Sequence, residues 1–82
     1  MKAEELTREM LRQALQIGDR ADKLRMDSPL LGHFPELNSL TVVNLLAAIE
    51  EQTGAPVDDE EISEELFQTF GSLVAFVRSK LD

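Results

Sequence analysis

Cysteine, tryptophan and tyrosine are all absent from this sequence of 82 residues. Without cysteine, the chain can form no disulfide, bind no metal through thiolates and use no thiol as a nucleophile. Any thiol chemistry must therefore come from a group supplied from outside. Glycine and proline are scarce, at four and three residues, and 43% of the residues are hydrophobic, which argues against a disordered chain. At this length, we expect residues 1–82 to form a single domain.

Long apolar runs are missing as well. No stretch approaches the roughly 18 consecutive apolar residues that a membrane-spanning helix needs. Residues 1–10 are charged and amphipathic, unlike a secretory signal with its apolar centre. We therefore expect a cytoplasmic, monomeric protein that does not insert into membranes.

Basic residues are absent from the whole middle of the chain. Residues 27–77 contain ten acidic residues and no lysine or arginine, and the net charge of the chain is -8. Such a charge distribution repels nucleic acid and anionic lipid, and it attracts proteins with a basic patch. We expect a protein partner of this kind, although an acidic surface also serves solubility alone.

Helical periodicity is clear in the first half of the chain. Apolar residues at intervals of three and four predict a helix from Ala3 to Ile17, ended by Gly18. A second helical pattern starts at Ser39 and ends at Gly54. Its apolar residues cover more than half of the circumference. This predicts neighbours on two sides of the helix, or an apolar part that lines a pocket or contacts a partner.

Two further helices are predicted in the second half. Asp58 and Glu61 have the spacing of an N-terminal capping box and predict a short third helix. Three apolar residues of this region are expected to face inward: Ile62, Leu66 and Phe67. Thr69 is a suitable cap for a last helix that extends to Leu81.

A long connection, residues 19–37, separates the first two helices. Loops of this length in small domains are either functional or packed by their own side chains. Leu30, Leu31 and Phe34 are the expected packing residues, and Pro35 disfavours helical conformation at Phe34. The whole pattern predicts an all-α fold, a small four-helix bundle with a long first loop and a short third helix.

The candidate functional residue is Ser39, at the junction between the long loop and the most apolar helix. It lies in the tract LGHFPELNSL of residues 31–40. An anionic group at this position would face unpaired backbone N–H groups and the positive end of the helix dipole. The dipeptide Asn38-Ser39 is also an ordinary N-terminal capping pair, so by itself it is weak evidence.

The tract and its surroundings resemble the acyl carrier protein family, whose members present Asp-Ser-Leu at the start of the second of four helices. The resemblance extends over essentially the whole chain, including the long first loop and the acidic middle. It implies that Ser39 carries covalent 4'-phosphopantetheine, that Leu40 is the apolar residue after it, and that the protein is a carrier without enzymatic activity. Asn38 stands where the family usually has aspartate, and the glycine often found just before the motif is instead Gly32.

The resemblance also implies the partners and the surface that meets them. A phosphopantetheinyl transferase would modify the chain, and an acyl-activating ligase, acyltransferase or synthase with a basic docking patch would load or use it. Thr41 and Asn44 replace acidic residues frequent in this part of the family. The docking surface of this helix is therefore expected to weaken at those two positions and to concentrate at Glu50 and Glu51.

Other functions have less support in the sequence. His33 is the only histidine, and no other residue pattern supplies a catalytic base, a nucleophile or a set of metal ligands. The alternative that remains is a non-carrier acidic adaptor that docks a basic partner. The cargo and pathway stay open among fatty-acid, polyketide-like and envelope or exopolysaccharide biosynthesis.

Overall fold

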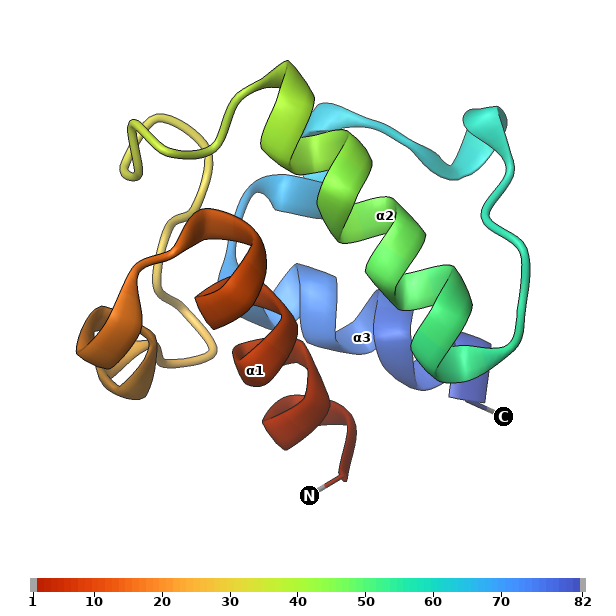
Figure 1. Cartoon of the computed structure of the whole chain (residues 1–82), viewed down its shortest axis with the longest axis horizontal. Coiled ribbons are helices and arrows are strands. Elements are labelled where there is room, and N and C mark those ends of the chain that lie inside the picture. The colour runs from red at the N-terminus through yellow and green to blue at the C-terminus, as the bar shows by residue number, and fades with distance from the viewer. Residues whose placement is uncertain (1, 82) are drawn as a thin grey trace.

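The computed structural model describes residues 2–81 as an all-α fold, which confirms the predicted class (Figure 1). Along the chain the elements are α1 (Lys2–Leu15), η1 (Gly18–Lys23), α2 (Ser39–Thr53), η2 (Asp59–Glu61), η3 (Glu64–Phe67) and α3 (Phe70–Leu81), where η marks a 3-10 helix. The described residues contain no strand beyond one isolated bridge, between Pro29 and Thr69.

The three α-helices enclose one core. The helix α1 packs against both α2 and α3, and Figure 1 shows α2 crossing over α3. The side chains at the meeting point have no exposed surface: Leu11, Leu30, Leu45, Ile49, Phe70, Leu73, Val74 and Val77. Burying one such side chain contributes about 1.5–3 kcal/mol. These contacts stabilise the bundle and position the N-terminal end of α2.

The first helix ends two residues earlier than predicted. Leu15 is its last residue, and Gln16 adopts a left-handed conformation with φ 55. This turn carries Ile17 back into the core, where its side chain is 4% exposed. The chain then enters η1 at Gly18, so part of the predicted loop is a 3-10 helix.

Arg8 ties η1 to two α-helices. Its Nη1 donates hydrogen bonds to the carbonyl oxygens of Ala21 at 2.5 Å and Leu24 at 3.0 Å. Its Nη2 pairs with Glu4 at 3.1 Å, and its guanidinium lies 4.9 Å from the centre of the Phe70 ring. The first part of the long connection is thereby held against α1 and α3.

The rest of the long loop is bonded to the start of α3 and to η3. Four backbone hydrogen bonds make this contact: Leu30 N to Gln68 O, Leu31 N to Phe67 O, Phe70 N to Ser28 O and Gly71 N to Met26 O, all between 2.8 and 3.1 Å. Leu30 and Phe34 are buried as predicted. The prediction is wrong for Leu31, whose side chain is 46% exposed because it points into a surface groove.

The predicted short helix is two separate 3-10 turns, η2 and η3. The Asp58 side chain forms no capping hydrogen bond, and Ser63 is extended with φ -148. Six acidic side chains lie within residues 58–65, and like charges three and four residues apart disfavour a continuous helix. Leu66 and Phe67 are buried as predicted, whereas Ile62 is 37% exposed between the two turns.

The predicted signals at the ends of α2 and α3 are confirmed. Gly54 follows α2 in the left-handed conformation, with φ 72. At the start of α3, Ser72 N donates to Thr69 Oγ1 at 3.0 Å and Thr69 N donates to Ser72 Oγ at 3.2 Å. Both signals act between neighbouring residues, which is why the sequence alone reveals them.

Candidate functional site

The N-terminal end of α2 is closed by two uncharged side chains. Asn38 Oδ1 accepts hydrogen bonds from the backbone N–H groups of Leu40 at 3.0 Å and Thr41 at 3.1 Å. In return, the Asn38 N–H donates to Thr41 Oγ1 at 2.8 Å. This is a complete capping box made of asparagine and threonine. The first turn of α2 contains no acidic residue.

The residues just before the box are held from a second direction. Thr41 Oγ1 donates to the carbonyl oxygen of Glu36 at 2.6 Å, and the Glu36 carboxylate pairs with Arg20 of η1. The Arg20 guanidinium also lies 5.8 Å from the centre of the Phe34 ring. The hydrogen bond from Arg20, with a smaller contribution from a backbone hydrogen bond, lowers the pKa of Glu36. The loop before α2 is therefore anchored at Glu36, through both the main chain and the side chain of that residue.

Ser39 is the first residue of α2 and is exposed to solvent. Within residues 2–81, no hydrogen bond involves its hydroxyl group. The expectation of unpaired N–H groups beside it is wrong for Leu40 and Thr41, because Asn38 Oδ1 accepts from both. The positive end of the α2 dipole remains as a source of favourable potential for an anion there.

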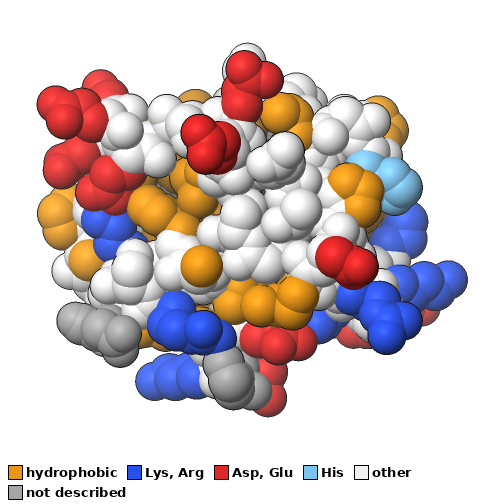
Figure 2. Space-filling model, turned by 180° about the vertical axis from the view of Figure 1, so that it is seen from behind, with side chains coloured by type: hydrophobic (Ala, Val, Ile, Leu, Met, Phe, Trp, Pro, Cys, Tyr) orange, Lys and Arg blue, Asp and Glu red, His pale blue; other side chains and the backbone are white. Residues whose placement is uncertain are grey.

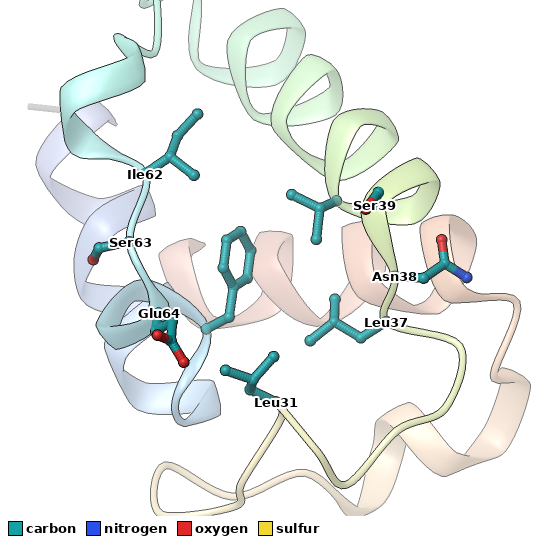
Figure 3. A pocket seen from close by; sticks show the side chains of 9 residues that line it. Leu31, Leu37, Asn38, Ser39, Ile62, Ser63 and Glu64 are labelled. Carbon is teal, nitrogen blue, oxygen red and sulfur yellow. The ribbon is translucent and has the colours of Figure 1, made fainter.

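A surface groove of about 420 Å³ lies beside Ser39 (Figure 3). In this view, Leu31 and Leu37 point into the groove from the long loop, while Ile62, Ser63 and Glu64 border it from the other side. Val42 and Phe67 complete its lining. An accessible hydroxyl next to a mostly apolar groove suits a covalently attached arm whose far end carries an apolar group.

The four predicted docking residues do not share one face of α2. Asn44 borders a shallow pocket against α1, whereas Glu50 borders a pocket on the side of Val57 and Ile62. Two of the four are engaged within the fold, because Thr41 belongs to the capping box and Glu50 Oε2 accepts from Val57 N at 2.7 Å. Glu51 is exposed.

Exposed apolar side chains on α2 agree with the second of the two alternatives offered for its excess of apolar residues. Leu45 and Ile49 are the buried residues of α2, whereas Leu40 is 69% exposed and Val43 is 61% exposed. The expectation of neighbours on two sides of α2 is therefore wrong for its first turns. The excess of apolar residues in the sequence of this helix was the signal for these exposed side chains, which lie on open surface near Ser39.

The fold and site define a small helical domain with an exposed serine at the start of a helix. The family model described as "Phosphopantetheine attachment site" matches residues 5–77. The solution NMR structure of a holo acyl carrier protein from Nitrosomonas europaea superposes with a TM-score of 0.89 at 46% identity, covering 99% of this chain and 98% of that one. No match is found among curated proteins. The chain belongs to the phosphopantetheine attachment-site family of acyl carrier proteins.

Family membership confirms that the chain is a carrier and not an enzyme, and that its cofactor class is covalent phosphopantetheine. No helix within residues 2–81 has the length and apolar character needed to cross a membrane. In the same part of the chain, no three His, Asp or Glu side chains lie together as a possible metal site.

Proposed function

We propose that Ser39 is the residue to which 4'-phosphopantetheine is attached, and that the chain then carries an acyl or aminoacyl group as a thioester on that arm. One observation carries this proposal: the Ser39 hydroxyl is exposed at the first residue of α2, beside an apolar groove and inside the matched span of residues 5–77. Ser63 also lines the groove, but it is an extended residue that precedes only the four-residue 3-10 helix η3 and does not begin an α-helix.

The attachment is a phosphoryl transfer that keeps the serine oxygen. Ser39 Oγ forms a bond to the phosphorus of a pantetheine phosphoanhydride such as coenzyme A. The phosphoanhydride bond breaks, the nucleotide leaves with the bridging oxygen, and the hydroxyl proton passes to a base on the transferase. The thiol that this chain lacks arrives at the end of the attached arm. The α2 dipole then stabilises the charge of the phosphodiester.

The groove beside Ser39 supports an apolar cargo. Five of its lining residues are apolar, namely Leu31, Leu37, Val42, Ile62 and Phe67, and the core beneath is closed by side chains without exposed surface. An acyl chain can therefore shelter along the surface groove. We propose that the chain delivers such a cargo to enzymes of fatty-acid, polyketide-like or envelope and exopolysaccharide biosynthesis.

Charge supports partners with a basic docking patch. Figure 2 shows acidic side chains gathered at one end of the molecule over η2, with basic side chains at the opposite end near the only histidine. Asp58, Asp59 and Glu60 are all exposed at the acidic end. We propose that this end orients the phosphopantetheinyl transferase and the loading ligase, acyltransferase or synthase in the cytoplasm.

The direct test is intact mass after incubation of the purified chain with coenzyme A and a broad-specificity phosphopantetheinyl transferase. We expect one phosphopantetheine on the wild type, none on Ser39→Ala, and one on the matched control Ser63→Ala. A wild type that stays unmodified with several transferases would overturn the proposal. A non-carrier adaptor would then be favoured if Glu51→Lys still abolished binding to a basic partner while Ser39→Ala did not.

A further inference from the structure

The Thr41 hydroxyl contacts three backbone groups on the N-terminal side of Ser39. It accepts from the N–H of Asn38 at 2.8 Å and donates to the carbonyl oxygen of Glu36 at 2.6 Å, a shorter contact than the 3.1 Å to the carbonyl oxygen of Asn38. We propose that Thr41 is a positioning residue, which holds the backbone just before Ser39 against the first turn of α2 so that the serine hydroxyl is presented to the modifying enzyme. This inference rests on the proposed attachment at Ser39.

The two bonds, to Asn38 N and to Glu36 O, require a side chain that accepts one hydrogen bond and donates another. Residues at this third helical position often complete a capping box with a carboxylate or an amide. A carboxylate could accept from Asn38 N, but when ionised it has no proton to donate to Glu36 O. A hydroxyl accepts and donates at once. The β-branch of threonine also restricts its χ1 rotamers, so less conformational entropy is lost in holding this geometry.

Glu36 is held in place by two contacts. Its carbonyl oxygen is bonded to Thr41 and its carboxylate is paired with Arg20, which belongs to η1. Asn38, two residues on, is bonded through its own N–H and its side chain. Ser39 is thus an exposed residue in a segment whose backbone is held by hydrogen bonds at Asn38 and Leu40. Loss of the Thr41 hydroxyl leaves Glu36 O and Asn38 N without these partners and frees the segment.

The role is distinct from a contribution to global stability, and α2 supplies a matched control. Thr53, at the opposite end of the same helix, donates from Oγ1 to Ile49 O at the same distance of 2.6 Å and is also half-buried. Thr53→Val therefore removes a comparable hydroxyl far from Ser39. Thr41→Val removes the positioning bonds, and Thr41→Ser restores them.

The experiment compares these variants with the transferase that modifies the wild type, using coenzyme A at a temperature where all variants are folded by circular dichroism. We expect Thr41→Val to lower kcat/KM about ten-fold, mainly through kcat, because a displaced nucleophile is productive less often. Thr41→Ser should recover most of the rate, and Thr53→Val should match the wild type. On the unmodified chain, Thr41→Val should accelerate amide hydrogen exchange at Leu40 and Thr41, and Thr53→Val should not.

The outcomes separate the two proposals. A wild type that no transferase modifies overturns Ser39 as the attachment site, and the positioning role with it. If the wild type and Thr41→Val are modified at equal rates, the positioning role alone is overturned. Equal rate losses in Thr41→Val and Thr53→Val would also overturn it, because the effect would then follow helix stability rather than the position of Ser39.

Discussion

Gly71, the second residue of α3, is a position where helix propensity and tertiary packing predict opposite effects. Replacing a helical glycine by alanine normally stabilises a helix, by up to about 1 kcal/mol. Here a Cβ on residue 71 would lie 2.5 Å from the carbonyl oxygen of Met26 and 3.3 Å from its carbonyl carbon. These are backbone atoms of the long loop, so they cannot move aside as a flexible side chain would.

The expected magnitude follows from the bonds that the loop must give up. Relieving the contact displaces Met26 O, which accepts from Gly71 N at 2.8 Å, and strains the adjacent bond from Phe70 N to Ser28 O at 2.8 Å. Each such bond contributes about 1 kcal/mol net. The loss of these two bonds exceeds the propensity gain, so we expect Gly71→Ala to lower the free energy of unfolding by about 1 kcal/mol.

Urea unfolding followed by circular dichroism measures this change. Ala75→Gly is the matched control, because Ala75 is an exposed residue of the same helix and should follow propensity alone. We expect the control to lose about 1 kcal/mol. If Gly71→Ala proved as stable as the wild type or more so, the steric argument and the close approach of the loop to α3 would both be refuted.

Three further predictions concern single contacts. Arg8→Met leaves Ala21 O and Leu24 O without the guanidinium and should cost about 2 kcal/mol of unfolding free energy in urea; an unchanged midpoint would contradict the role of Arg8. The ion pair of Glu36 with Arg20 lowers the pKa of Glu36 from its ordinary value of 4.5. The pair therefore contributes stability above that pH, and this stability is lost as the pH falls through the pKa of the folded state. A pH series of urea midpoints should therefore be flatter in acid for Glu36→Gln, and an unchanged acid slope would count against the pair. Ile49→Ala, in the core, should cost about 2–5 kcal/mol by thermal or urea unfolding, whereas the exposed Leu40→Ala should be nearly neutral; equal losses would contradict the observed burial.

Much of the fold follows from patterns that extend over only a few residues. The intervals of three and four define the three long helices, Gly54 ends α2, and Thr69 caps α3, as the sequence predicted. The start of α2 at Ser39 was also predicted. These features depend on hydrogen bonds and side-chain periodicity within one or two helical turns, so the local sequence is sufficient to determine them.

Features that join distant parts of the chain were decided by the tertiary structure. The sequence did not reveal the pairing of Arg20 with Glu36, the exposure of Leu31, or the approach of Met26 to Gly71. In each case the outcome depends on where a remote segment packs. Local periodicity therefore determined the helices, and the tract before the second helix, with its family resemblance, indicated the serine. Packing of the long loop determined how the segment before that serine is held, because such contacts carry no local pattern.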